Sequence, residues 1–174
     1  MPEETEIRAA LRAGPLAPRT EEIAALARPC VHLLTDPVTV SALSPATSRI
    51  GGVPDLPPGV EWPRWKGEPQ SFIAQLDLAD VAGLPGTRLL PGAGSLVFFY
   101  TARQDTWGFD PSDRGSWSVI HAPPGADLTR TEPPGPVPDG GRFRSCAVTF
   151  RSTQSLPAPL SKQIEGLNLG PEEE

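Results

Sequence analysis

The stretch Ser48–Pro63, SRIGGVPDLPPGVEWP, is the most distinctive segment of this 174-residue chain. Gly51 and Gly52 permit a positive φ angle, or a close approach of backbone that a side chain would block. The prolines that follow hold a stiff, extended path, which cannot enter a sheet interior because proline donates no ladder hydrogen bond. Trp62 is a large apolar anchor for this path. We expect a loop fixed across a sheet, with a rigid binding loop as the alternative.

Two amphipathic helices are expected near the N-terminus. Pro2–Ala13 has acidic residues in its first turn and apolar residues at helical spacing, and Gly14 follows it as a stop signal. Thr20 is the expected N-cap of the second helix, which ends before Pro29.

The rest of the chain predicts strands separated by long loops, because 17 glycines and 23 prolines force short elements. No crossover helices separate the strands, so parallel pairing is not expected. The fold class is α+β, with two N-terminal helices followed by a mainly antiparallel β-sheet with long Pro/Gly-rich loops. The expected strands are Cys30–Leu34, Val38–Leu43, Ser71–Leu78, Ser95–Thr101, Ser116–Ala122 and Arg142–Ser152, with a turn at Asp36-Pro37, a helical turn at Ala79–Val81 and a short helix at Leu160–Leu167.

The length predicts one domain over residues 1–174, with a core at about 20–156. Ser95–Thr101 is apolar on both faces, so we expect it at the centre of the sheet. The tail 157–174 is expected to be weakly ordered and to add no core element.

The third expected strand carries an unusual polar pair. Alternation places Phe72 and Ala74 on one face and Gln75 and Asp77 on the other. Buried polar groups need partners, so this pair either ties down the Gly-Gly loop or lines a pocket. Arg49 is the expected partner of Asp77.

Charge and composition exclude several classes of protein. A net charge of −6 disfavours a nucleic-acid footprint, which needs clustered basic residues. The N-terminus is acidic and lacks the apolar core of a secretory signal, and the longest apolar run, Leu96–Tyr100, is too short to span a membrane. We therefore expect a cytoplasmic protein that binds neither nucleic acid nor membrane.

Two cysteines and two histidines make up the whole set of soft metal ligands: Cys30, His32, His121 and Cys146. None has the close pairing that marks a zinc site. We expect isolated buried thiols in a reducing compartment, satisfied histidines, and no metal or cofactor.

A charged turn follows the expected central strand. Asp110 with Pro111 is expected to open a turn, Asp113 and Arg114 to pair, and Gly115 to take a positive φ angle. The spacing fails the pattern of a calcium loop. Aromatic residues around these charges leave a binding role open as the alternative: Trp107, Phe109 and Trp117.

No motif supports an enzyme at the level of residues. There is no G-x-S-x-G elbow, no HExxH and no Walker A sequence. The glycine-rich run at residues 92–94 precedes a strand rather than a helix, so it is not a phosphate loop.

One known family shares these features. The run SRIGGVPDLPPGVEWPRWKGEPQSFIAQLDLADV, followed by LPGAGSLVFFY, resembles the YwqG family, a bacterial domain family of unknown function. Longer members of that family continue into a second half, so the resemblance implies a short or truncated form. It also implies that Arg49, Gly51, Gly52 and Trp62 are signature residues. Suspected association of such proteins with bacterial toxin systems points to an immunity-type role.

Three interpretations of function follow. The first is a non-catalytic protein-binding or regulatory module, for example of immunity type, whose partner is another protein. The second is a small-ligand-binding or enzymatic domain, with a cleft floored by Gln75 and Asp77 and rimmed by Arg49, Trp62 and Trp107. The third is a remnant without independent activity. The sequence predicts no oligomeric state.

Overall fold

The computed structural model describes residues 2–37 and 43–169, and it divides into two compact units. The first unit contains Met1–His32, Gly83–Leu89 and Arg151–Glu174, and the second contains Leu33–Ala82 and Leu90–Phe150. The expected strand Val38–Leu43 lies outside the described residues except for its last position. The single-domain expectation stays a prediction.

The helices of the first unit are short. α1 spans Pro2–Arg12, which confirms the first expected helix. A 3-10 turn, η1 (Ala17–Arg19), leads directly into α2 (Thr20–Ala24). The expected N-cap role of Thr20 is wrong, because its hydroxyl donates to the carbonyl oxygen of Ala17 at 2.9 Å. The chain is already helical in η1, so the carbonyl oxygen of Ala17 lies one turn before Thr20 and within reach of its hydroxyl.

A small apolar cluster holds the first unit together. Buried residues from α1 and α2 form its centre, and the C-terminal tail packs against it on both sides of α3 (Lys162–Glu165). Within the tail 157–174, Leu167 packs against this cluster. The members are Leu11, Ile23 and Ala24, with Ile7, Leu16, Leu156 and Leu167 packed against them.

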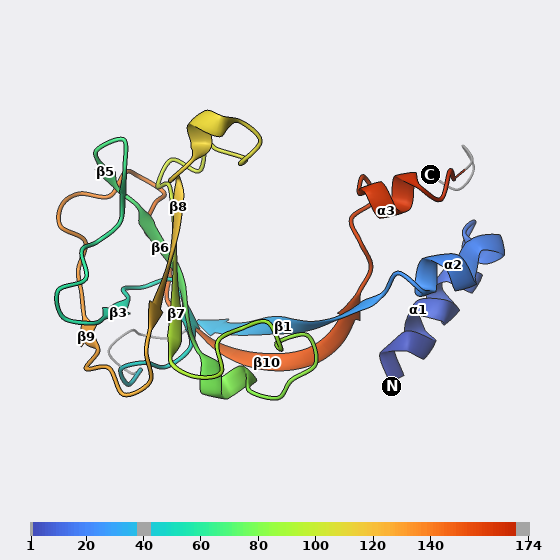
Figure 1. Cartoon of the computed structure of the whole chain (residues 1–174), viewed down its shortest axis with the longest axis horizontal. Helices are drawn as coiled ribbons and strands as arrows, with labels where there is room; N and C mark the ends of the chain where they lie inside the picture. Colours follow the sequence, from blue (N-terminus) through green and yellow to red (C-terminus); the bar gives the residue numbers. More distant parts are fainter. Residues whose placement is uncertain (1, 38–42, 170–174) are drawn as a thin grey trace. The chain divides into compact units, whose positions relative to one another are not determined.

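A six-stranded sheet with the order β1-β10-β2-β6-β7-β8 dominates the structure (Figure 1). Its registered pairs, from β10 through β2, β6 and β7 to β8, are all antiparallel. β7 lies between β6 and β8, so it is an interior strand, but it is the fifth of six and not the central strand that was expected. The strands are β1 (Arg28–Pro37), β2 (Arg49–Ile50), β6 (Ser71–Asp77), β7 (Ser95–Tyr100), β8 (Trp117–Ala122) and β10 (Cys146–Ser155).

Two sequence expectations about this sheet are wrong. Asp36-Pro37 is not a turn but the end of β1, because that strand is longer than its apolar stretch. The Pro/Gly segment is not only a loop, since its residues Arg49 and Ile50 form β2 in the sheet interior, between β10 and β6. The prolines themselves stay outside this ladder.

Short elements complete the fold. Two two-stranded sheets pair β3 with β9 and β4 with β5. The expected helical turn is confirmed as η3, which follows β6. Their bounds are β3 (Asp55–Leu56), β9 (Thr129–Arg130), β4 (Arg64–Trp65), β5 (Glu68–Pro69), η3 (Leu78–Val81), η4 (Pro111–Asp113).

The main core lies on one face of β6 and β7. Trp62 meets Phe99 edge-on, with ring centroids 5.1 Å apart, which confirms the anchoring role of this tryptophan. Phe72 packs edge-on against the same ring at 5.9 Å. Leu56 and Val97 complete the buried cluster.

A register shift in β6 decides which residues face this core. Phe72 pairs with Phe99, whereas Gln75 pairs with Val97, and the register slips between Phe72 and Ala74. The bulge places Phe72 and Gln75 on the same face, because directly paired residues share a face. The expected simple alternation is therefore wrong, and Gln75 points toward the core.

Gly51 lies where the chain needs a glycine. Its φ angle is +67°, and a Cβ atom built on it would lie against the carbonyl oxygen of Arg144 and only 2.9 Å from that of Phe143. The neighbouring Gly52, with φ +76°, donates its N–H to the oxygen of Phe143 at 2.9 Å. Both expected roles of the Gly-Gly pair, positive φ and close approach, are confirmed.

Gly51→Ala is expected to lower the free energy of unfolding by about 3 kcal/mol, since it combines left-handed strain with a backbone clash. Gly59→Ala is the matched control, because Gly59 has φ +78° but nothing within 4 Å of the added Cβ. This control should cost only about 1 kcal/mol. Urea unfolding measures both, and equal losses would contradict the importance of the close approach.

Candidate functional site

A buried ion cluster joins β2, β3 and β9. Arg49 Nη2 lies 2.9 Å from Asp55 Oδ2, and both side chains are 0% exposed. Arg130 Nε lies 3.0 Å from the other carboxylate oxygen of Asp55, and its side chain is 28% exposed. One carboxylate thus joins two guanidinium groups from separate segments of the second unit.

Gln75 supports this cluster from β6. Its Oε1 accepts a hydrogen bond from the backbone N–H of Asp55 at 2.8 Å. Arg49 donates to the carbonyl oxygen of Val53 at 2.6 Å, and the N–H of Ala46 donates to Asp55 Oδ2 at 3.0 Å. Gln75 therefore ties down the segment after the Gly-Gly pair, which was one of the two roles expected for it.

The environment shifts the pKa values of the buried pair. Burial alone would raise the pKa of Asp55, but hydrogen bonds and charge from Arg130 and Arg49 together bring this pKa below its ordinary value. Burial lowers the pKa of Arg49, and the opposing charge of Asp55 partly compensates. An arginine stays protonated under such conditions, so the pair remains ionic at neutral pH.

The expected pair between Arg49 and Asp77 is wrong. In the sheet register Arg49 lies opposite Gln75, two residues before Asp77. Asp77 instead ends β6 and accepts a hydrogen bond from the N–H of Ala79 at 3.0 Å, which begins η3. Ser48 Oγ accepts from the N–H of Asp77 at 2.8 Å.

The ion cluster does not form a cleft. Arg49 and Gln75 have no exposed surface, and Trp62 is buried in the core. Trp107, the other residue expected at the rim, is 83% exposed and lies in the aromatic segment before β8. Buried groups that satisfy one another offer no contact to a ligand, so this cluster has a structural role.

Sequence reasoning missed Asp55 and Arg130. Asp55 is an acidic residue inside a proline-rich stretch, and it lies six positions after Arg49. An acidic residue this close in sequence to Arg49 was the signal that could have identified Asp55 as its partner. Arg130 is the last residue of β9, a short strand 75 residues further along the chain, and the pairing of β3 with β9 brings it to Asp55.

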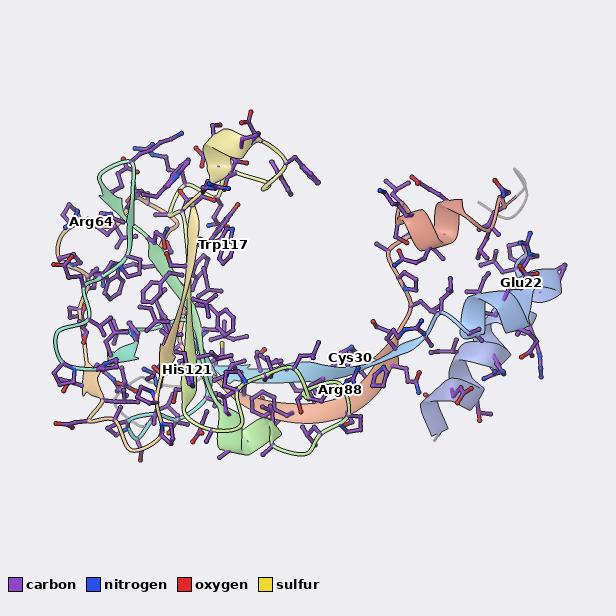
Figure 2. All side chains as sticks on the ribbon, viewed as in Figure 1. Glu22, Cys30, Arg64, Arg88, Trp117 and His121 are labelled. Atoms are coloured by element: carbon purple, nitrogen blue, oxygen red, sulfur yellow. The ribbon has the colours of Figure 1, made fainter. Side chains whose placement is uncertain are left out.

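A second cluster consists of exposed aromatic side chains. The segment 107–117, here called the aromatic loop, carries η4 and ends at the first residue of β8 (Figure 1). Trp107 is 83% exposed, Phe109 is 93% exposed and Trp117 is 62% exposed. Phe109 and Trp117 line an open depression of about 800 Å³, together with Asp110 and Arg114. Figure 2 shows Trp117 near one end of β8 and His121 near the other.

Hydrogen bonds hold the aromatic loop in place from inside. Asp113 Oδ2 accepts from the N–H groups of Trp107 and Gly108 at 3.2 and 3.0 Å. The amide of Gln70, only 1% exposed, donates to the carbonyl oxygen of Gly115 at 2.7 Å. The loop is therefore a fixed platform rather than a chain free to rearrange.

The turn chemistry expected in this loop is confirmed in part. Asp110 Oδ1 accepts from the N–H of Ser112 at 2.7 Å, and this backbone hydrogen bond lowers the pKa of Asp110. Gly115 has φ +87°. Among the ion pairs of the described residues, however, Asp113 and Arg114 do not pair, because the Asp113 carboxylate is used by the loop backbone.

Within residues 2–37 and 43–169, no group of three or more His, Cys, Asp or Glu side chains could hold a metal ion. No helix there is long and apolar enough to cross a membrane. Cys30 and Cys146 are free thiols, and they are half-buried rather than fully buried.

A family model for a domain of unknown function, DUF1963, matches residues 48–168. The match begins at the first residue of the signature segment and includes both the ion cluster and the aromatic loop. No curated protein matches the chain.

Asp55→Ala is expected to lower the free energy of unfolding by about 3–5 kcal/mol, because it leaves Arg49 buried without its counter-ion. Glu68→Ala is the control, since Glu68 pairs with Arg103 at the surface and both side chains are more than 40% exposed. The control should cost less than about 1 kcal/mol. Chemical denaturation compares them, and a small loss for Asp55→Ala would show that the buried pair is not essential.

Acid should weaken the fold through Asp55. Because its folded pKa lies below the value of about 4 in an unfolded chain, its stabilisation is complete above that value. It is lost as the pH falls through the folded pKa. The unfolding free energy of the native chain should therefore fall more steeply below about pH 4 than that of Asp55→Asn. Parallel slopes in denaturant titrations at several pH values would contradict this.

Proposed function

The chain belongs to the DUF1963 family, a domain family of unknown function, and on that premise we propose that it is a non-catalytic protein-binding or regulatory module. The aromatic loop is its contact surface, and the bound partner is another protein. The exposure of Trp107, Phe109 and Trp117 on one fixed loop is the observation that carries this proposal.

Exposed aromatic side chains on one surface are typical of binding sites. Large exposed apolar groups cost free energy in water, and proteins rarely gather them without a partner. Tryptophan and tyrosine are also enriched among the residues that contribute most to binding. Two of these side chains, Trp107 and Phe109, lie two positions apart and make no ring contact within the described structure.

The rigid support of the loop favours binding further. Asp113 fixes the backbone at Trp107, and buried Thr106 donates to Ser116 Oγ at 3.0 Å. Tyr100 donates to the carbonyl oxygen of Thr106. A loop already held in one conformation loses little entropy when a partner binds, so more of the contact energy appears as affinity.

Charged side chains around the aromatic residues suit a protein partner. Asp110 and Arg114 are exposed at the edge of the depression. Protein interfaces commonly combine an apolar centre with such a polar rim. An immunity-type or regulatory role among cytoplasmic, YwqG-like bacterial proteins is the finer form of this proposal. The alternative ligand cleft has no comparable support, because Arg49 and Gln75 are enclosed.

The double substitution Trp107→Ser with Phe109→Ser is expected to abolish capture of the partner from a lysate of the native host. The same partner, once identified by mass spectrometry and purified, should bind the variant at least about tenfold more weakly in calorimetry. The reason is that both side chains lose their buried contact area while the loop backbone keeps its hydrogen bonds to Asp113.

Leu89→Ser is the control for non-specific hydrophobic binding, since Leu89 is 88% exposed but lies outside the aromatic loop. It should capture the partner as the native chain does. Equal binding of the partner to the native chain and to the double variant would contradict the proposed surface. Equal loss of binding in the double variant and in Leu89→Ser would contradict it as well.

A further inference from the structure

Among residues 2–37 and 43–169, only β7 pairs with β8, so β8 is an edge of the six-stranded sheet. The N–H of Thr101 donates to the carbonyl oxygen of Ser116 at 2.6 Å, so Ser116 faces β7 with its backbone groups. Antiparallel pairing alternates, and the backbone groups of Trp117, Val119 and His121 therefore point away from β7. In the described part of the chain these groups have no hydrogen-bond partner.

This edge lacks the features that prevent strands from pairing. Natural edges are protected by proline, by charged residues or by bulges. β8 has the sequence WSVIHA, with no proline, lysine, arginine or acid, and its register with β7 is unbroken. By contrast β1, at the other end of the sheet order, contains Arg28, Pro29, Asp36 and Pro37.

The exposed side chains of β8 add an apolar stripe to this edge. Trp117 is 62% exposed and Val119 is 45% exposed, and both lie on the same face as His121. The stripe and the unpaired backbone together fit an extended strand better than a helix or a flat surface, because only a strand satisfies the backbone groups.

We infer that β8 pairs with β8 of a second copy of this chain, in antiparallel orientation, so that two sheets become continuous. This contact goes beyond the proposed binding of another protein through the aromatic loop, with which it shares only Trp117. The strand suits its own copy because it is self-complementary: it carries no acidic or basic residue that would face its own kind across a two-fold axis.

The geometry fixes the register. Only Trp117, Val119 and His121 offer outward backbone groups, so the longest pairing places Val119 on the two-fold axis, opposite the second copy's Val119. Trp117 then lies opposite the second copy's His121, and the reverse.

The size of this contact predicts a weak dimer. A tryptophan side chain buries about 150–250 Å² when fully covered, and each copy offers one at this edge together with a valine. The total area falls near or below about 1,200 Å², the low end for specific interfaces. We therefore expect a reversible dimer with a dissociation constant in the micromolar range rather than a permanent one.

Sedimentation velocity of the native chain, over about 5 to 500 micromolar, should show reversible association to twice the mass of the 18.5 kDa chain. Val119→Pro should weaken the association at least about tenfold, since it removes an outward N–H but none directed toward β7. Val119→Lys should do the same by charge repulsion at the two-fold axis. Circular dichroism and thermal unfolding confirm that each variant is folded.

Val119→Thr is the matched control, because it keeps the backbone N–H and the branched shape, and it should associate within about threefold of the native chain. The pair Trp107→Ser with Phe109→Ser should also leave the dimer intact, which separates this contact from the proposed partner surface. A native chain that stays monomeric up to the highest concentration overturns the inference, as does a dimer that Val119→Pro and Val119→Lys leave unchanged.

A cross-link tests the register itself. Val119→Cys, in a chain with Cys30→Ser and Cys146→Ser, should form a disulfide-linked dimer under mild oxidation. Paired residues on the axis lie about 5.5 Å apart between Cα atoms, which is within disulfide reach. Thr149→Cys in the same background is the control, as Thr149 is exposed on β10 inside the sheet order and should not cross-link. Equal cross-linking at both positions would reject the register.

Discussion

The buried ion pair between Arg49 and Asp55 is the constraint on which the second unit depends. Two side chains without exposed surface carry opposite charges 2.9 Å apart. A buried charge without its partner would cost several kcal/mol, so each residue requires the other to be in place. Arg130 and Gln75 complete the requirement, because they satisfy the remaining groups of the carboxylate and of the backbone beside it. Four separate segments of chain are thereby brought to one position.

The ion pair between Arg49 and Asp55 explains the sequence of the Pro/Gly segment, residues 48–63. Gly51 allows the chain to turn sharply after β2, against the backbone of Arg144, and so to return Asp55 to Arg49. The prolines then carry the chain to Trp62, whose ring completes the core against Phe99. The Pro/Gly segment thus contributes a strand to the sheet and a side chain to the core. Its high glycine content follows from the need to reverse the direction of the chain within a few residues after β2.

The aromatic loop has the opposite character. Asp113 within the loop and Gln70 beneath it hold the loop backbone, and the loop's aromatic side chains are turned outward. An arrangement that stabilised the fold alone would bury Trp107 and Phe109. Both contact surfaces that we propose, the aromatic loop and the edge of β8, lie next to each other along the chain. Hydrogen bonds beneath the loop hold its backbone, and β8 is held by its pairing with β7.

The sequence by itself determined a mainly antiparallel sheet after N-terminal helices, the positions of the longer strands, the interior place of β7 and the need for glycine at Gly51, since each of these follows from local composition and periodicity. It also identified Arg49 and Gln75 of the ion cluster, but not Asp55 or Arg130, and it identified the aromatic residues of the second cluster. Tertiary structure alone decided that Arg49 pairs with Asp55 rather than Asp77, because the register of β2 with β6 places Arg49 opposite Gln75 and the turn at Gly51 and Gly52 brings Asp55 back to Arg49. It also decided that the aromatic residues lie in water. Partner choice and exposure depend on contacts between distant segments, and no local pattern encodes them.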